Sequence, residues 1–230
     1  MYKNIDYFEN KHYPNLKEKA YDILEEMIVT LELKPGTTYS ESELSEATGI
    51  GRTPVREAIK NLETTHMLEI IPRSGIYISP IRLEECFLQM EVRVLLEKLV
   101  AVRAANFSTP SEREKFLELA KRYEESNKNE DALLSVRIDN EFNHFVSNCA
   151  RNIFAKSALM PLQPLARRLY FSQYHINKDL IHRINQTHID TIRAIANGES
   201  EKVVEITEEL IKGVKSLTTF NLDSTSNFFK

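Results

Sequence analysis

The segment from Ser40 to Ile78 constrains the fold of this chain more than any other stretch. Ser40 and Glu43 have the spacing of a capping box, so the sequence predicts a short helix that begins at Glu41. Gly49 follows the predicted helix, and glycine tolerates the left-handed backbone conformation that ends many helices. The pattern therefore predicts a short helix followed by a tight turn.

A second helix is expected directly after this turn. Thr53 and Pro54 suit the N-cap and the first helical position, respectively. The apolar residues that follow recur at i, i+3, i+4 and i+7 and predict one buried face; they are Val55, Ala58, Ile59 and Leu62. Two short helices around a glycine-containing turn, the second with arginine at its N-terminal end, are typical of a helix-turn-helix.

Residues 68–78 continue the pattern with two short β-branched stretches around a Pro/Ser/Gly turn. This arrangement predicts a β-hairpin that carries Arg73 at its tip. A preceding amphipathic helix is expected from Leu16 to Leu31, because its apolar residues keep helical spacing. Residues 1–14 are polar with several aromatic residues and are expected to form a flexible arm.

Residues 44–63 fit the pattern L-S-E-x-x-G-[IV]-x-R-T-P-V-R-E-A-[IL]-x-x-L-E, and residues 73–78 fit R-x-G-[IFV]-x-[IV]. This stretch resembles the GntR family of bacterial winged-helix transcription factors. The resemblance implies that the second helix reads double-stranded DNA and that a wing approaches the minor groove. The residues implied to contact DNA are Arg52, Thr53, Arg56, Lys60, Arg73 and Gly75. Ser42 departs from several relatives, which carry arginine there, so one base contact is expected to be missing or replaced.

The charge of the chain limits how it can bind DNA. The net charge is −4, and residues 1–80 alone contain 9 Lys and Arg against 13 Asp and Glu. Non-specific binding depends on neutralising phosphates, so we expect modest affinity that depends on sequence. Cys86 and Cys149 lack metal-ligand spacing and are expected to be buried thiols in a reducing cytoplasm. No signal peptide or membrane span is expected.

The predicted fold is mostly α-helical and has two domains. Residues 1–79 are expected to form a winged helix-turn-helix of three helices and a β-hairpin wing. Residues 80–220 predict an all-α bundle of six or seven helices, with Pro161 and Pro164 kinking or splitting one of them. Residues 221–230 are expected to be a disordered tail.

The second domain resembles the FCD ligand-binding domain of the FadR-type subfamily within the same family. The residues that carry this resemblance are 90–97, 139–143 and 188–198. It implies a domain that binds a small carboxylate effector and contributes to a homodimer. The residues implied to bind the effector are Arg93, Asp139, Asn143 and His188.

In the resembling subfamily an Asp and three His bind a divalent metal, and here only Asp139 and His188 match. Asn143 and Leu210 stand where the other two histidines are expected, so we predict a weak, incomplete divalent-metal site or a polar cluster around a cavity. We predict no other cofactor.

Two further assignments stay open. Arg93 on an apolar helix either pairs with an acid such as Glu97 or binds an anionic effector. A basic and aromatic group lines the cavity or lies on the dimer surface; it consists of Arg167, Arg168, Tyr170, Tyr174, His175 and His182.

The sequence therefore predicts a cytoplasmic, ligand-responsive regulator that binds a palindromic operator as a dimer, as winged-helix proteins do. The resemblance further implies a repressor that a small organic acid releases from DNA. The alternative is a metal-dependent enzyme using the Asp/His cluster of the helical domain. The sequence shows neither a nucleophile paired with a base nor a glycine-rich phosphate loop, so we expect no enzyme.

Overall fold

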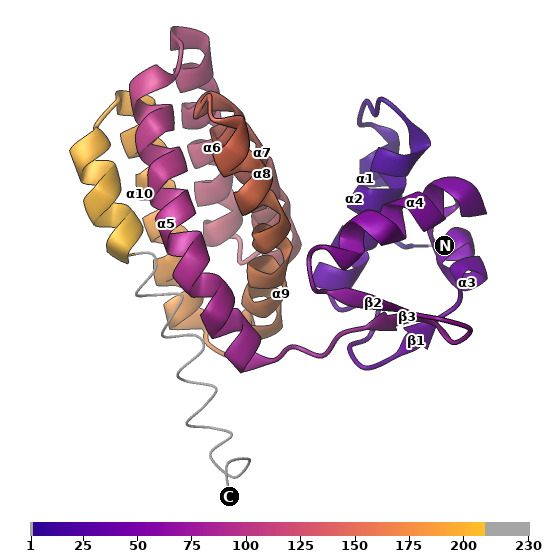
Figure 1. Ribbon diagram of the computed structural model, residues 1–230. Helices are drawn as coiled ribbons and strands as arrows, with labels where there is room; N and C mark the ends of the chain where they lie inside the picture. Colours follow the sequence, from indigo (N-terminus) through magenta and orange to yellow (C-terminus); the bar gives the residue numbers. More distant parts are fainter. Residues whose placement is uncertain (1, 210–230) are drawn as a thin grey trace, which may run out of the picture. The chain divides into compact units, whose positions relative to one another are not determined.

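The computed structural model describes residues 2–209, which form two compact units. The first unit ends at Ile81, and the second begins at Arg82 (Figure 1). The predicted tail at 221–230 and the predicted helix end near residue 220 lie outside the described residues. None of the helices within residues 2–209 combines the length and apolar character needed to cross a membrane.

The first unit is a winged helix-turn-helix. Its elements are α1 (Asp6–Glu9), α2 (Leu16–Val29), β1 (Thr38–Tyr39), α3 (Glu41–Thr48), α4 (Arg52–Glu63), β2 (Leu68–Ile71) and β3 (Gly75–Ile78). The antiparallel sheet has the order β1-β3-β2, so the predicted hairpin gains a third strand. We did not predict β1, because two residues are too short to show the alternation that marks a strand.

The capping box that begins α3 is confirmed. Ser40 Oγ accepts a hydrogen bond from the Glu43 backbone N–H at 3.2 Å. Glu43 Oε2 accepts one from the Ser40 N–H at 2.7 Å. Gly49 takes the left-handed conformation (φ 67°) after α3, as its position predicts.

The prediction that Thr53 caps α4 is wrong. The helix begins at Arg52, two residues before the predicted Pro54, with Gly51 as its N-cap. Pro54 is still tolerated, because backbone N–H groups in a first helical turn have no intrahelical acceptor to lose. The predicted buried face is confirmed, and its members are Val55, Ala58, Ile59 and Leu62.

The N-terminal residues pack against the rest of the first unit, whereas the sequence predicts a flexible arm there. Tyr2 and Phe8 are both buried. The Tyr2 N–H donates to the Ala47 carbonyl at 2.7 Å, and the Tyr2 hydroxyl donates to Glu26 Oε1 at 3.1 Å. Aromatic side chains bury a large apolar area, and this burial offsets the polar character of their neighbours in the sequence.

The second unit is an all-α bundle. Its elements are α5 (Leu83–Phe107), α6 (Pro110–Lys128), α7 (Ala132–Cys149), α8 (Ile153–Leu159), the 3₁₀ turn η1 (Met160–Leu162), α9 (Gln163–Gln173), α10 (Lys178–Asn197) and a helix over residues 200–209. Within the described residues this makes seven α-helices, as predicted. In Figure 1, α5 runs in front of α6 and α7, with α10 on one side and α8 and α9 on the other.

Local signals set the helix ends of this bundle. Thr109 and Glu112 have the sequence spacing of a capping box, and they form one at the start of α6. The segment with Pro161 and Pro164 is split into α8, η1 and α9, as the two prolines predict. Gly198 ends α10 in the left-handed conformation (φ 75°), as a glycine after a helical pattern predicts.

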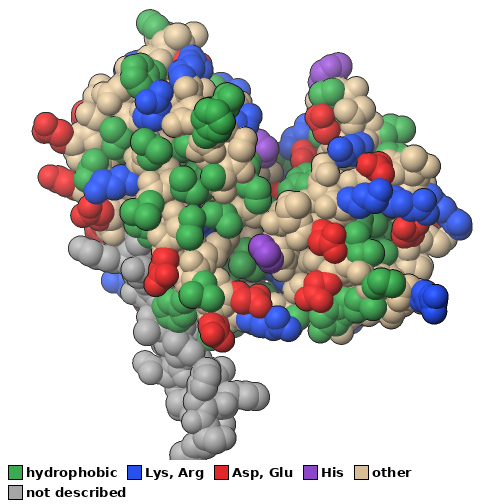
Figure 2. All heavy atoms as spheres, viewed as in Figure 1, with side chains coloured by type: hydrophobic (Ala, Val, Ile, Leu, Met, Phe, Trp, Pro, Cys, Tyr) green, Lys and Arg blue, Asp and Glu red, His purple; other side chains and the backbone are tan. Residues whose placement is uncertain are grey.

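The bundle leaves an apolar stripe of α5 uncovered within the described residues. Its side chains are 44% to 70% exposed, and they are Leu88, Val92, Leu95 and Leu99. Figure 2 shows hydrophobic side chains gathered on the face of this unit along which α5 runs. The opposite side of the same helix buries Met90, Val100 and Ala104 in the bundle. Helix α5 is therefore apolar on two opposite sides, which is unusual for a helix at the surface of a monomer.

Candidate functional site

The candidate DNA-binding surface is the solvent-facing side of α4. Arg52, Arg56 and Lys60 are four residues apart and form one exposed stripe, with Thr53 exposed beside them. The buried face of α4 orients this stripe toward solvent, because the apolar residues lie on the opposite side of the helix. The four side chains of α4 that the resemblance implies contact DNA are therefore all exposed, while their contacts with DNA stay a prediction.

Two of these arginines contact the first turn of α3. Arg56 Nε donates to Glu41 Oε1 at 2.8 Å, and Arg56 Nη2 donates to Glu41 Oε2 at 2.6 Å. Hydrogen bonding from Arg56 lowers the pKa of the Glu41 carboxyl. Arg52 Nη2 donates to Ser42 Oγ at 3.1 Å, whereas Lys60 pairs with Glu57 of its own helix.

The wing carries the other two predicted residues. Arg73 lies at the exposed tip between β2 and β3 with φ 64°. Gly75 has φ 129°, and a Cβ there would lie 2.6 Å from the Tyr39 carbonyl oxygen. Glycine is thus required at residue 75 by the close approach of β1, a reason internal to the domain that the sequence did not reveal.

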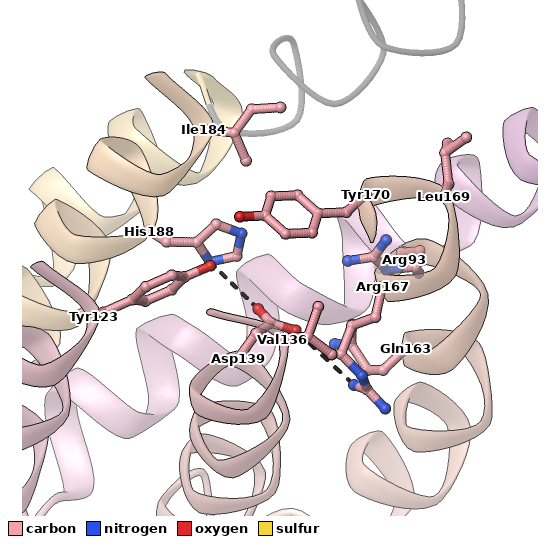
Figure 3. A pocket seen from close by; sticks show the side chains of 11 residues that line it. Arg93, Tyr123, Val136, Asp139, Gln163, Arg167, Leu169, Tyr170, Ile184 and His188 are labelled. Carbon is pink, nitrogen blue, oxygen red and sulfur yellow. Dashed lines mark ion pairs between the residues drawn. The ribbon is translucent and has the colours of Figure 1, made fainter. Parts of the chain in front are cut away.

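The candidate effector site is a cavity of about 40 Å³ inside the helical unit. In Figure 3 its polar side chains point toward one another from α5, α6, α7, α9 and α10. The side chains that line it include Arg93, Tyr123, Asp139, Gln163, Arg167, Tyr170 and His188. The space is enough for a few waters.

Arg93 both pairs with an acid and faces this cavity, so the two readings of the sequence are compatible. The residue is 7% exposed, and its Nε donates to Glu97 Oε1 at 3.1 Å. Gln163 Nε2 donates to the same Glu97 oxygen at 3.1 Å. Within the described residues Arg93 Nη1 is buried without a hydrogen-bond partner, so it remains a donor for an anion.

Asp139 is the acidic centre of the cavity. Asn143 Nδ2 donates to Asp139 Oδ2 at 2.8 Å, and Arg167 Nη1 lies 3.9 Å from that same oxygen. His188 Nδ1 lies 3.8 Å from Asp139 Oδ1. Figure 3 shows the carboxylate between His188 and Arg167. The structure therefore brings Asp139, Asn143 and His188 together, and it adds Arg167, which the sequence left undecided.

Burial favours the neutral form of His188. Burial lowers its pKa, and the neighbouring Asp139 carboxylate opposes this shift only in part. Its ring lies 5.7 Å from the Tyr123 ring, and burial raises the Tyr123 pKa well above the usual range. Among the described residues that line the cavity, Arg93 and Arg167 contribute guanidinium groups.

A second cavity of about 30 Å³ shares Gln163 and His188 with the first. Asn143 lines this second space together with apolar residues such as Phe142 and Val146. Helical periodicity predicts which residues of one helix share a face, but it does not show which cavity each of them lines.

The other members of the basic and aromatic group defined from the sequence lie in different places in the structure. Tyr170 lines the first cavity, while Tyr174 and His182 line a separate small space with Lys178. His175 is exposed. Arg168 is fully buried, and burial lowers its pKa to about 10.

Comparisons with known proteins show which families and relatives this chain resembles. The profile of bacterial regulatory proteins of the gntR family matches residues 16–78, and that of the FCD domain matches residues 89–213. The HTH-type transcriptional repressor RspR of Escherichia coli is 34% identical over 97 residues, 42% of each chain. The HTH-type regulator YdhC of Bacillus subtilis is 26% identical over 144 residues, 60% of this chain and 62% of its own.

These matches span less than two thirds of the length of the relatives, and for RspR about two fifths. The solved structure of E. coli McbR/YncC superposes with a TM-score of 0.78 at 17% identity, covering 91% of this chain and 99% of that one. A regulator from Rhodococcus superposes at 0.56 with 16% identity, covering 93% and 99%. These two structures show the fold of the chain.

The cavity residues do not fit a tight divalent-metal site. Within the described residues no group of three His, Cys, Asp or Glu side chains is placed to hold a metal. Asp139 Oδ2 already accepts from Asn143, and a guanidinium 3.9 Å away opposes a second cation. Leu210, where a further ligand was expected, lies outside the described residues.

We predict that extensively dialysed protein retains far less than one equivalent of zinc or nickel, because Asp139 and His188 are too few ligands for tight binding. Elemental analysis of the purified chain measures this directly. The Asn143→His variant, which supplies a third ligand, should retain more metal than wild type. Near-stoichiometric metal in wild type that disappears in Asp139→Ala would contradict the assignment.

Proposed function

The chain belongs to the GntR family of bacterial regulatory proteins and carries an FCD domain, and on this basis we propose a ligand-responsive repressor that binds a specific operator. It is a transcription regulator; its families and its relatives are regulators of transcription and not enzymes. The observation that carries the proposal is the exposed row of Arg52, Arg56 and Lys60 on the second helix of the helix-turn-helix. The name of RspR, a repressor, supports the proposed direction of regulation.

Sequence recognition is proposed to depend on the arginines of α4. A guanidinium can donate two parallel hydrogen bonds to guanine O6 and N7 in the major groove. Arg52 and Arg56 are exposed at the N-terminal end of α4, the end that helix-turn-helix proteins direct to base edges. Lys60 and Arg73 would add phosphate contacts, and Thr53 and Gly75 would complete the surface at the helix and the wing.

Dimerisation is proposed to use the apolar stripe of α5. Leu88, Val92, Leu95 and Leu99 are spaced by four, three and four residues, which is the spacing of a helix–helix seam. A second copy of the chain would cover this stripe with its own α5. One recognition helix reads too few base pairs for selectivity, so a two-fold dimer on a palindromic operator follows from the same proposal.

The effector is proposed to be a small carboxylate held by Arg93 and Arg167. Both guanidinium groups face the cavity, burial favours the neutral form of His188, and Arg93 Nη1 is a buried donor whose acceptor is not among the described residues. An anion at this point would compete with Glu97 for Arg93, and Asp139, Asn143 and His188 would orient it. Release from DNA would require that the effector bind two arrangements of the protein with different affinity.

The proposed place of action is the cytoplasm, where chromosomal DNA is found. Cys86 and Cys149 are both buried and free, which suits a reducing compartment. The metal-dependent enzyme considered from the sequence has no support from the family, and its Asp/His cluster does not fit a metal.

Operator binding is tested with a DNA duplex selected from a random pool by the wild-type chain. Arg52→Ala and Arg56→Ala should each weaken binding to that duplex by about 1–3 kcal/mol per half-site, because each loses a bidentate base contact. Fluorescence anisotropy measures the affinity. Arg183→Ala, which removes an exposed arginine of α10, is the matched control. Wild-type affinity and salt dependence in both α4 variants would exclude α4 as the reading helix.

The effector site is tested by separating sensing from DNA binding. Arg93→Gln should keep operator affinity near wild type but lose release by the carboxylic acid that dissociates wild type from DNA in a panel of small acids. Arg122→Gln, which breaks the surface ion pair of Arg122 with Glu141, is the control and should respond normally. Normal release of Arg93→Gln by the same acid would move the effector site elsewhere.

The dimer is tested by placing a charge in the α5 stripe. Leu95→Glu should shift the chain to monomer in sedimentation velocity, because a buried unpaired carboxylate is costly in an apolar seam. Leu117→Glu carries the same change at an exposed leucine of α6 and should leave the assembly unchanged. A Leu95→Glu variant that sediments as wild type does would show that α5 is not the interface.

A further inference from the structure

The pairing of Glu41 with Arg56 bears on how this chain distinguishes its operator from other DNA. The two oxygens of Glu41 accept from Nε and Nη2 of Arg56 at 2.8 and 2.6 Å, a side-on bidentate pair. Both side chains are partly exposed, 55% for Arg56 and 35% for Glu41. An exposed ion pair of this kind contributes little to folding, so its main effect concerns the orientation and charge of Arg56.

Glu41 is itself held in place by α3. It is the first residue of that helix, after the Ser40 cap, where the helix dipole favours a carboxylate. Arg52 and Lys60 act on it along with Arg56, since the charges of all three lower its pKa. Glu41 is therefore a negative group that lies close to the cations of the proposed DNA-binding surface.

The pair leaves Arg56 with one usable edge. Of its five N–H donors, Nε and one on Nη2 are directed at Glu41, and the donors of Nη1 and the second on Nη2 remain. One donor of Nη1 and the remaining donor of Nη2 form the end-on edge of the guanidinium, which matches the parallel acceptors O6 and N7 of guanine. Because the carboxylate restrains the side chain, less conformational entropy is lost when that edge meets a base.

The charge of Glu41 adds a second effect. Non-specific binding comes from the attraction of cations to phosphates, and Glu41 cancels the charge of Arg56 at that point. A guanine edge is a neutral acceptor, whereas a phosphate is an anion that the carboxylate repels. The paired arginine therefore favours a base over a phosphate more strongly than a free arginine would.

From these contacts we propose that Glu41 is a specificity-determining, positioning residue, which orients Arg56 toward a base edge and reduces its attraction to phosphates. The proposal rests on the proposed function of the chain as a sequence-specific DNA binder. It assigns the discrimination between sequences to both helices of the motif, since α3 controls how an arginine of α4 is presented.

The test compares Glu41→Gln with Glu43→Gln in the full-length chain. Both variants remove one negative charge from the first turn of α3, but Glu43 bonds to the Ser40 backbone and not to Arg56. The probes are the duplex selected by wild type and a shuffled duplex of the same composition, each titrated at several salt concentrations. Circular dichroism confirms that both variants are folded.

The measured quantity is the ratio of the two dissociation constants, shuffled over selected. Glu41→Gln should lower this ratio about tenfold, the order of discrimination that one bidentate arginine–guanine pair provides. Its binding to shuffled DNA should tighten and show a steeper salt dependence. Glu43→Gln should keep the ratio within about twofold, as surface changes distant from a contact usually do.

A repeated selection with Glu41→Gln gives a second readout. The selected sequences should lose their preference at the position read by Arg56 in each half-site. If Glu41→Gln keeps the wild-type ratio and the wild-type sequence preference, the inference fails while the proposed function stands. If wild type enriches no sequence from the pool, the proposed function fails and this inference fails with it.

Discussion

The burial of one face of α4 determines where the chemistry of the first unit lies. Val55, Ala58, Ile59 and Leu62 are in the core, so the residues between them are forced to the surface. An α-helix has a fixed rotation per residue, and the position of Arg52 and Arg56 is therefore set by apolar residues that never approach solvent. The core of the domain therefore determines where the proposed DNA-binding surface lies.

Cations in both units are controlled by carboxylates placed near them. Glu41 holds Arg56 at the surface, Glu97 holds Arg93 in the bundle, and Asp139 lies between Arg167 and His188. At the surface such a pair redirects an arginine, while in the interior it allows a charge to remain buried. The total charge of the chain therefore does not describe the charge at either of these sites.

Sequence reasoning succeeded where the signal was local. The capping boxes at Ser40 and Thr109 and the glycine stops at Gly49 and Gly198 depend on residues within one turn, and the structure has them where the sequence predicts. The motif patterns also brought Asp139, Asn143 and His188 to one region. The partner of Arg56 is 15 residues away across a turn, and Gln163 and Arg167 reach the cavity only through packing. The buried Tyr2 and Phe8 were missed because two aromatic residues in a polar stretch carry no periodicity.

Helix α5 has a further consequence through its two apolar sides. Arg93 faces the cavity from one side, and its sequence neighbours Val92 and Leu95 belong to the exposed stripe on the other. In a dimer built on that stripe, the two copies of α5 would lie between the two cavities. A single layer of side chains would separate the two helices. Occupancy of one cavity would then be coupled, through the packing of this seam, to the occupancy of the other.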